Sequence, residues 1–547
     1  MKIRLLATFV FITKIIFAQQ EFTLPNVTIP HFKKDTFNIE KYGAVSNGMD
    51  LNTKAINATI EACSKNGGGV VLLPPGLWLS GPIVLKSNIN LLISRGATLL
   101  FTRDFSAYAL IKSNWEGVNQ MRNQSPISAD GAQNIAITGE GIIDGNGDAW
   151  RMVKKDKVNA TQWKKFISSG GLLSDDKKTW YPSEKSFKGT LYSNPGAITS
   201  PEKSNAFYDS VKDFLRPNMV FLLKCKNVYL QGVTFQNSPA WCLHPLMCEN
   251  LTVKNIQVRN PSFAQNGDGI DVESCKNVVI ASSVFDVGDD AICMKSGRDE
   301  QGRQRNKPTE NVSISGCTVY ASHGGFVIGS EMSGGVKNIT VNNCTFIGTD
   351  IGLRFKTTRG RGGLVENIFI NNIYMKDIVG EAILFDMYYT AKDPVPLEGE
   401  KRELPKVERK PVDETTPQFR NFSINNVYCN GAEKAIFIRG LPEMHISDIQ
   451  LKNITIQSKN GIDIQEASNI NFNKVHVIPE NTHPVVDIIN SDGIQFDNLT
   501  YPAGTENLIR VSGEKNKNIQ VLHTDSSKSK EKLILELGAT ESMIQFK

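Results

Sequence analysis

The chain has 547 residues, of which 21% are charged and 40% are hydrophobic, as in an ordinary soluble protein. After residue 18, no stretch of the sequence is long and apolar enough to cross a membrane. The formal net charge is +5, and removal of residues 1–18 would take away three basic side chains and no acidic one, which leaves +2. So weak a positive charge does not indicate a nucleic-acid-binding protein.

Residues 1–18 have the pattern of a secretory signal peptide. Lys2 and Arg4 form a basic start, a mostly apolar run follows, and Ala18 precedes the expected cleavage point, although Lys14 interrupts the run. A membrane anchor is the alternative interpretation, but the run is short for a membrane span. We therefore expect an exported protein, either periplasmic or secreted.

The next segments predict a lead and a helix. Residues 19–36 form a short lead, and residues 52–65 carry apolar side chains at helical spacing. Thr53 is a candidate for the N-cap of this helix. A helix at the start of a repeat array is expected to cap the open end of its core.

From residue 78 onward the sequence repeats, and each unit contains short apolar strands, turns and a recurring phrase with a central Asn. These Asn residues stand 23 to 34 positions apart, at 227, 250, 277, 311, 338 and 367, with weaker copies at 88, 134, 421 and 469. A drifting period with several strands per unit is typical of a right-handed parallel β-helix, whose side chains stack in columns about 4.8 Å apart. We expect the Asn residues to occupy tight turns with left-handed backbone.

The predicted fold class is therefore all-β, with residues 37–547 forming one β-helix domain that carries insertions at about 150–217 and 391–418. The first insertion is rich in aromatic residues and predicts an ordered wall. The second is rich in Pro, Lys and Glu and predicts a solvated excursion. We expect most of the nine Cys residues to be small buried hydrophobes, while one or two disulfides are possible in an exported protein.

Alignment of one strand through successive coils predicts two inward columns of apolar side chains. The first column is Ile270, Ile292, Phe326, Leu353 and Ile383, and the second is Val272, Met294, Ile328, Phe355 and Phe385. Strand alternation then directs a set of charged side chains to the outer face: Asp271, Lys295, Arg354, Lys356 and Asp386. Three further polar residues lie just before this strand in adjacent coils: Asp268, Asp290 and His323. The repeat thus predicts acids, an imidazole and cations in one groove.

This combination indicates acid–base chemistry on an anionic substrate. Asp289 and Asp290 are neighbours in sequence, and clustered carboxylates cannot all ionise freely, so one pKa should rise. A protonated carboxyl beside ionised ones is typical of glycoside hydrolysis. Arg354 and Lys356 are natural partners of a carboxylate, which a uronic acid polymer would supply. The alternative is a set of salt bridges along a solenoid face, which stays open above all for Lys295 and Asp271.

Four motifs carry a resemblance to a known family. Asn266-Gly267-Asp268, Asp289-Asp290, Ser322-His323-Gly324 and Arg354-Phe355-Lys356 resemble, in order, the Asn-Thr-Asp, Asp-Asp, Gly-His-Gly and Arg-Ile-Lys signatures of glycoside hydrolase family 28, the polygalacturonases. The resemblance extends over nearly all of the chain after the signal peptide. It implies a parallel β-helix that hydrolyses α-1,4-linked galacturonic acid in pectin with inversion, without a metal or another cofactor.

The resemblance also implies a role for each residue. Asp289 would be the general acid, Asp268 and Asp290 would activate water, and His323 would tune the acid or help to hold the site. Arg354 and Lys356 would bind the galacturonate carboxylate. A Tyr after the next strand often contributes in the family, which leaves Tyr388 and Tyr389 as candidates, of which we select Tyr389.

Residues 150–217 and the phrases around Arg298, Ser330 and Arg359 are similar to the exo-acting branch of the family. A wall at one end of the groove would hold a chain end there, and Arg298 and Arg359 would bind further carboxylates, unless they only brace loops. Alternatives are a rhamnogalacturonan or xylogalacturonan hydrolase, a calcium-dependent pectate lyase and a non-catalytic glycan-binding β-helix. We expect a monomer whose partner is an anionic polysaccharide.

Overall fold

The computed structural model describes residues 27–199, 203–389 and 407–547. The predicted signal peptide at 1–18 and residues 391–406 of the second predicted insertion lie outside these residues. In the part that is described, no helix is long and apolar enough to cross a membrane.

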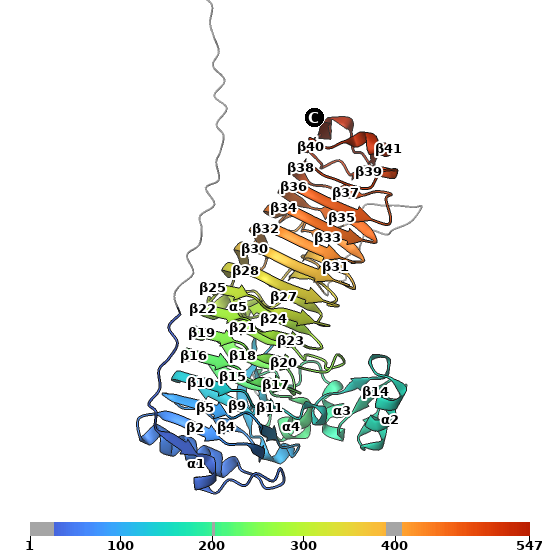
Figure 1. The fold of residues 1–547 in the computed structure, drawn as a ribbon. Helices are drawn as coiled ribbons and strands as arrows, with labels where there is room; N and C mark the ends of the chain where they lie inside the picture. The colour runs from blue at the N-terminus through green and yellow to red at the C-terminus, as the bar shows by residue number, and fades with distance from the viewer. Residues whose placement is uncertain (1–26, 200–202, 390–406) are drawn as a thin grey trace, which may run out of the picture.

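The chain winds into a right-handed parallel β-helix whose coils stack from the N-terminal to the C-terminal end (Figure 1). One parallel sheet has fourteen strands, and their order in the sheet follows their order in the sequence. These strands are β4 (Ile83–Val84), β9 (Ile127–Asp130), β15 (Val220–Leu223), β18 (Leu243–Leu246), β21 (Ile270–Glu273), β24 (Asp290–Lys295), β27 (Gly324–Ile328), β29 (Leu353–Lys356), β31 (Glu381–Asp386), β33 (Lys434–Arg439), β35 (Asn460–Gln465), β37 (Val486–Ile489), β39 (Thr505–Ser512) and β41 (Ser529–Glu536).

A second sheet of 23 strands forms the rest of the coil wall, in two runs that merge at β28. The longer run is β1 (Thr36–Asn38), β2 (Gly69–Leu73), β5 (Ile89–Ile93), β10 (Gln133–Gly139), β16 (Lys226–Gln231), β19 (Glu249–Lys254), β22 (Lys276–Ala281), β25 (Thr309–Ser315), β28 (Val336–Ile347), β30 (Leu364–Lys376), β32 (Gln418–Asn430), β34 (Ile446–Ser458), β36 (Ala467–Pro479), β38 (Asp492–Asp497), β40 (Ile519–Leu522) and β42 (Ile544–Phe546). The shorter run is β3 (Gly76–Ser80), β6 (Ala97–Phe101), β11 (Ile142–Asp144), β17 (Thr234–Gln236), β20 (Gln257–Arg259), β23 (Val284–Asp286) and β26 (Thr318–Tyr320).

Helix α1 (Thr53–Lys65) closes the N-terminal end of the core, as predicted, and buries Ile56 and Ile60 there. The predicted cap is wrong, because Thr53 is already the first helical residue and its Oγ1 accepts a hydrogen bond from the Gly81 N–H at 2.6 Å. Asn52 occupies the N-cap position without a side-chain cap. Its amide oxygen instead accepts from the Val45 N–H at 2.7 Å, so both polar side chains stabilise the adjoining turns.

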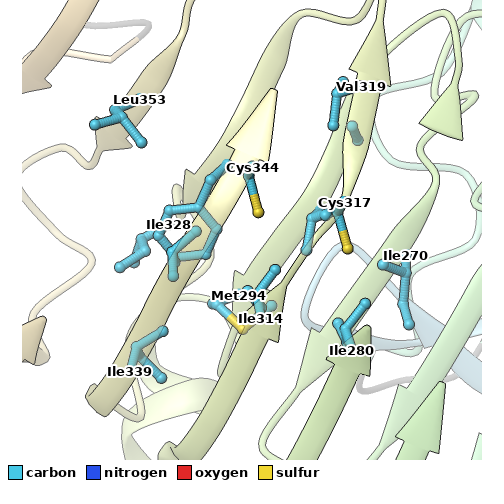
Figure 2. Packing of buried hydrophobic residues seen from close by; sticks show 14 of the residues in the cluster. Ile270, Ile280, Met294, Ile314, Cys317, Val319, Ile328, Ile339, Cys344 and Leu353 are labelled. Atoms are coloured by element: carbon cyan, nitrogen blue, oxygen red, sulfur yellow. The ribbon is translucent and has the colours of Figure 1, made fainter. Parts of the chain in front are cut away.

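The two predicted inward columns are confirmed, and each member is paired in register with the next along the fourteen-stranded sheet. All ten side chains are fully buried (Figure 2 shows part of this packing). All nine cysteines are buried and free, which confirms that they behave as small hydrophobes. A continuous apolar core of this kind holds the coils in one register.

The Asn residues of the repeat all have positive φ, between 52° and 64°, so the predicted left-handed turns are confirmed. The sequence did not indicate that these side chains also bind one another. Each amide NH₂ donates to the amide oxygen of the Asn one coil earlier, from Asn134 to Asn421, at 2.6–3.2 Å. This ladder of amides ties successive turns together along the edge of the coils.

Two excursions leave the coils near the N-terminal end. The first is an antiparallel hairpin of β7 (Leu110–Trp115) and β8 (Val118–Asn123). The second lies between β11 and β15 and comprises η3 (Gly147–Ala149), β12 (Val153–Lys154), η4 (Lys155–Lys157), α2 (Ala160–Ser168), β13 (Leu172–Leu173), β14 (Thr179–Tyr181), α3 (Glu184–Thr190), α4 (Asn205–Ser210) and η5 (Lys212–Phe214). Its helices project from the side of the coils (Figure 1). We call the hairpin together with residues 147–199 and 203–217 the wall.

The wall has its own packing. Val153, Trp163 and Trp180 form a small separate core. It is attached to the coils where the rings of Phe166 and Phe263 meet edge to face, with centroids 5.6 Å apart. The remaining short helices are η1 (Ile39–Tyr42), η2 (Phe105–Ala107), α5 (Asp299–Arg305), η6 (Ser526–Lys528) and η7 (Glu541–Met543).

The amide ladder predicts a stability effect at Asn277, which donates to Asn250 at 3.0 Å and accepts from Asn311 at 3.2 Å. Asn277→Ala should lower the free energy of unfolding by about 1–3 kcal/mol, because it removes two hydrogen bonds and places Ala at φ 58°. Asn277→Gly should cost less, because Gly tolerates that φ. Denaturant titration of the purified variants measures both values, and a Gly variant as unstable as the Ala variant would contradict the backbone part of this account.

Candidate active site

Three carboxylates meet at one point on the outer face of the fourteen-stranded sheet. Asp268 lies two residues before β21, and Asp290 is the first residue of β24. Because Ile270 pairs with Ile292, Asp268 and Asp290 occupy equivalent positions in adjacent coils. One oxygen each from Asp268, Asp289 and Asp290 lies within 4.8 Å of the other two. Acids this close can share protons, and they could also hold a divalent cation.

The turns that carry these acids are packed closely against a neighbouring turn. A Cβ at Gly267 would lie 2.7 Å from both Cβ and the carbonyl oxygen of Ala264. A Cβ at Gly288 would lie 2.4 Å from the Pro261 carbonyl oxygen. The Thr of the family signature therefore has no room at position 267 unless this turn moves, which accounts for the departure at this position.

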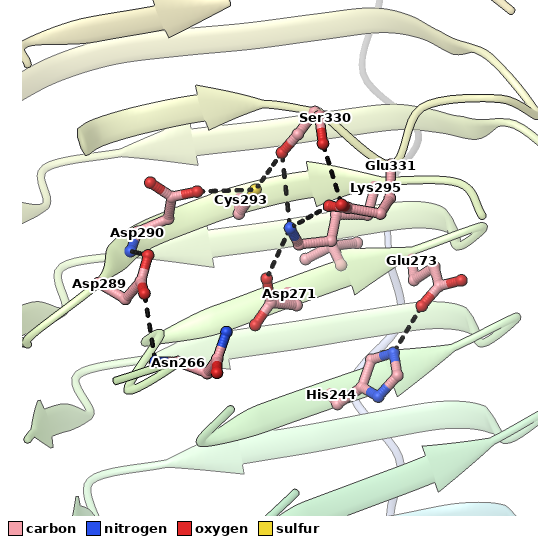
Figure 3. Close-up of polar contacts among 12 residues, drawn as sticks. His244, Asn266, Asp271, Glu273, Asp289, Asp290, Cys293, Lys295, Ser330 and Glu331 are labelled. Atoms are coloured by element: carbon pink, nitrogen blue, oxygen red, sulfur yellow. Dashed lines mark hydrogen bonds and ion pairs between the residues drawn. The ribbon is translucent and has the colours of Figure 1, made fainter. Parts of the chain in front are cut away.

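Asp289 is the most accessible acid of the three, with 21% of its side chain exposed against 2% for Asp290. One of its oxygens accepts from the Asn266 backbone N–H at 3.2 Å, and the other from the Asp290 N–H at 3.0 Å (Figure 3). His323 Nδ1 lies 3.1 Å from Asp289 Oδ1, and Nε2 lies 3.7 Å from Asp350. The hydrogen bond with Asp289 raises the pKa of His323; burial opposes this shift, and the charges of the nearby carboxylates add to it.

Asp290 is held by two cations. Lys356 Nζ lies 2.6 Å from one of its oxygens, and a terminal Arg354 nitrogen lies 3.1 Å from the other. Burial alone would raise the pKa of Asp290, but attraction to Lys356, Arg354 and Lys295 outweighs it and holds the pKa well below the usual range. Asp290 is therefore ionised, and the two cations that the sequence assigned to a substrate carboxylate already have a carboxylate partner in the protein.

The pKa of Asp268 is shifted in the opposite direction to that of Asp290. Burial of Asp268, reinforced by repulsion from Asp271 and Asp289, raises its pKa well above the ordinary value, although Lys295 opposes the shift. Burial also raises the pKa of Asp271, even though Lys295 Nζ lies 3.7 Å away. Lys295 is drawn toward Glu331, 2.8 Å from its ammonium group (Figure 3). The raised pKa expected from clustered acids thus falls on Asp268 and Asp271.

The two candidate tyrosines have different surroundings. The Tyr389 ring centroid lies 4.8 Å from Lys356 Nζ and 5.8 Å from the Arg354 guanidinium carbon. Tyr388 is buried, and its ring faces Arg439 at 4.7 Å. Tyr389 is therefore the one that adjoins the carboxylate cluster.

The two further arginines of the prediction lie in different places. Arg298 lines the cavity described next, where it forms an ion pair with Glu116 at 3.1 Å. Arg359 is outside the lining of that cavity and binds both oxygens of Glu443, at 2.6 and 2.9 Å. A bidentate pair of this kind holds the guanidinium in a fixed orientation.

A cavity of about 490 Å³ lies between the wall and the turn that carries Gln265 and Asn266. Asn266 belongs to its lining, and its backbone N–H is the group that donates to Asp289. The wall contributes aromatic and cationic side chains, among them Trp115, Arg122, Trp150, Tyr181 and Arg216. The sequence did not indicate Trp115, Arg122 or Arg216, although the break in strand alternation at Glu116-Gly117 is a signal for the hairpin that carries the first two.

Comparison with known proteins agrees with this geometry. Residues 203–426 match Glycosyl hydrolases family 28. The crystal structure of a hyperthermoactive exopolygalacturonase from Thermotoga maritima is similar, with a TM-score of 0.65 and 30% sequence identity, over 81% of this chain and 93% of that chain.

Two curated relatives extend the comparison. An exo-poly-alpha-D-galacturonosidase from Dickeya chrysanthemi is 28% identical over 453 residues, which is 80% of this chain and 70% of the relative. A probable polygalacturonase from Vitis vinifera is 29% identical over 345 residues, which is 61% of this chain, and the match spans only 60% of the relative's length. These similarities show that the chain belongs to glycosyl hydrolases family 28.

Proposed function

We propose that the protein is an exo-acting galacturonan hydrolase that cleaves α-1,4-linked galacturonic acid in pectin with inversion. The observation that carries this proposal is the meeting of three carboxylates and two cations beside a cavity that is lined mainly by the wall. The carboxylates supply acid–base chemistry, and the cations suit an anionic sugar chain. The leader-like residues 1–18 support export, and we expect the exported protein to act as a monomer.

Asp289 is the proposed general acid. It would donate a proton to the glycosidic oxygen as the bond from that oxygen to the anomeric carbon breaks. Three groups hold its carboxyl in place: the Asn266 N–H, the Asp290 N–H and His323. Asp289 also has the most exposed side chain of the three acids. Its hydrogen bond to Asn266 brings it next to the cavity, because Asn266 is part of the lining.

Asp290 and Asp268 are the proposed water-activating pair. Asp290, kept ionised by Lys356 and Arg354, would accept a proton from the attacking water as its oxygen bonds to the anomeric carbon. Asp268 would help to orient that water. The raised pKa of Asp268 favours a second assignment, in which Asp268 is the general acid. Substitution of Asp268 and of Asp289 by Asn distinguishes the two assignments.

The distance between the carboxyl groups bears on whether the reaction inverts or retains the anomeric configuration. Inverting glycosidases commonly separate their two carboxyl groups by roughly 6.5–9.5 Å, and retaining enzymes by about 5 Å. The 4.8 Å limit here joins the nearest oxygens rather than the centres of the carboxyl groups, so it understates their separation. The spacing alone favours neither outcome, and inversion rests on family membership.

Arg354, Lys356 and Tyr389 are the proposed contacts for the carboxylate of the galacturonate unit at the cleavage point. Both cations are bound to Asp290, which fixes their positions before a sugar arrives. The Tyr389 ring lies beside both of them. A rhamnogalacturonan or xylogalacturonan hydrolase would use the same acids and differ in the flanking pockets, so the choice of substrate backbone is made by assay.

The first prediction concerns products. With polygalacturonate and a chelator present, the protein should release reducing ends without unsaturated products, because the mechanism uses only its own carboxylates. A single short product should accumulate from the first minutes if the cavity beside the wall holds the chain end, as exo action requires. Nuclear magnetic resonance of that product should show the anomer opposite to the α-linkage of the polymer.

Each alternative has its own outcome in this assay. Unsaturated products that disappear with chelator would indicate a lyase, and a ladder of mixed oligomers would indicate endo cleavage. A first product with the α configuration would contradict inversion. Faster turnover of rhamnogalacturonan or xylogalacturonan would identify that polymer as the preferred substrate.

The second prediction separates the acids. Asp289→Asn should lower kcat on trigalacturonate by about 10²- to 10⁴-fold, because it removes the proton donor but keeps the hydrogen-bond acceptor. Most of this loss should disappear on a nitrophenyl galacturonide, whose leaving group needs no proton. Asp290→Asn should lose activity on both substrates, since it removes the base.

Asp350→Asn is the matched control, because Asp350 also faces His323 but stands outside the trio. It should change kcat on trigalacturonate only slightly. Recovery on the nitrophenyl substrate by Asp268→Asn instead of Asp289→Asn would make Asp268 the acid.

The third prediction concerns pH. The pKa of His323 is raised in the folded protein, so the His323–Asp289 pair keeps its proton to a higher pH than an isolated imidazole would. The alkaline limb of kcat/KM should therefore lie above about pH 6.5 in the wild type. In His323→Gln this limb should be displaced or lost, because the imidazole with the raised pKa is no longer present. A limb that stays in place, measured from pH 4 to pH 9, would exclude His323 from tuning the acid.

A further inference from the structure

Two arginines in the cavity lack an acidic partner. Arg122 comes from β8 and has only 4% of its surface exposed, and Arg216 comes from the end of the wall. Neither forms an ion pair with any carboxylate in the described parts of the chain. Arg298, the third arginine of the lining, differs because Glu116 neutralises it at 3.1 Å. Among the described residues of the lining, Glu116 is the one acid against three arginines, so this part of the cavity has an excess of positive charge.

Neutral groups hold both guanidinium groups in place. Arg122 lies over the Trp115 ring, 3.6 Å from its centroid, and its Nε donates to the Arg216 carbonyl at 3.0 Å. Arg216 donates to the carbonyls of Pro239 and Gln265 at 3.0 and 2.8 Å. These contacts fix the positions of the cations but supply no negative charge of their own.

This arrangement is costly unless an anion enters. Burial lowers the pKa of Arg122, and repulsion from Arg216 lowers it further. Burial likewise lowers the pKa of Arg216 to about 10. A buried charge normally has a partner of opposite sign, and two adjacent guanidinium groups favour a planar, bidentate acid such as a carboxylate.

The arginines are also linked directly to the catalytic turn. Arg216 donates to the Asn266 side-chain oxygen at 2.8 Å, and the Asn266 backbone N–H donates to Asp289. On the other side, the rings of Trp115 and Trp241 are stacked with centroids 6.2 Å apart. An anion held by Arg122 and Arg216 would therefore lie next to the acids, on the side away from Arg354 and Lys356.

We propose that Arg122 and Arg216 bind the carboxylate of a galacturonate unit at the end of the chain, with Trp115 as the aromatic side of the pocket. This proposal rests on the proposed function and adds the residues that select the chain end. The pocket would discriminate against an end unit whose carboxyl is methyl-esterified or absent, because a neutral group leaves both buried cations unpaired. Free galacturonate should occupy the same pocket.

Binding is tested first, without catalysis. Calorimetry should detect galacturonate, and not galactose, on the wild-type protein. Arg122→Gln should weaken galacturonate binding by about 10- to 100-fold, the value expected for loss of a hydrogen bond to a charged group. Arg95→Gln is the control, because Arg95 is an exposed arginine outside the cavity lining and its loss should leave galacturonate binding unchanged.

Kinetics then test the chain-end role. The substrates are trigalacturonate and two derivatives that carry one methyl ester, on either the reducing or the non-reducing end unit. The wild type should show a higher KM for one of these two isomers only. Arg122→Gln should raise KM for trigalacturonate by about 10- to 100-fold with little change in kcat, and should treat the two isomers alike.

Unchanged discrimination between the isomers in Arg122→Gln would overturn the proposal, as would equal binding of galacturonate and galactose by the wild type. A role of Arg122 in folding alone would lower the melting temperature and leave the ratio between the isomers intact. Failure of the proposed function would look different, since the wild type would then hydrolyse none of the three oligomers while galacturonate binding could still be measured.

Discussion

The register between adjacent coils is the constraint on which the site depends. Asp268, Asp290, His323 and Arg354 come from separate coils, and they meet because Ile270, Ile292, Phe326 and Leu353 are paired in line beneath them. Side chains alternate between the two faces of a strand, so a slip of one residue would turn Arg354 and Lys356 into the apolar core. The amide ladder and the apolar columns act against such a slip from two sides of the coil. The same contacts that stabilise the fold therefore set the catalytic distances.

Burial gives the carboxylates different tasks. Asp268 and Asp290 are both removed from water, but Asp290 has two cations within hydrogen-bonding distance and Asp268 has none. Burial raises the pKa of Asp268, whereas attraction to the cations reverses that effect at Asp290. Identical side chains in adjacent coils thus have pKa values that are shifted in opposite directions by their surroundings alone.

The sequence predicted those parts of the structure that follow from local periodicity. The apolar columns, the left-handed Asn turns and the grouping of the acids all depend on strand alternation and on a repeat, which a single sequence displays. The predicted N-cap of α1 was wrong, because Thr53 accepts a hydrogen bond from Gly81 instead. The hydrogen bonds between the Asn side chains were not predicted. Both features depend on which coils become neighbours, and this cannot be read from the identity of a single residue.

The sequence did not predict the cavity either, because its lining also depends on which segments become neighbours. Arg122 and Arg216 lie 94 positions apart, in segments without a repeat, and become neighbours only when the hairpin packs against the end of the wall. The wall has its own small core of Val153, Trp163 and Trp180, which is distinct from the core of the coils. The proposed pocket is held by the wall and the coils together, because Arg216 donates to the Pro239 and Gln265 carbonyls and Trp115 stacks on Trp241. Asn266 links this pocket to the acids, because its side-chain oxygen accepts from Arg216 while its backbone N–H donates to Asp289.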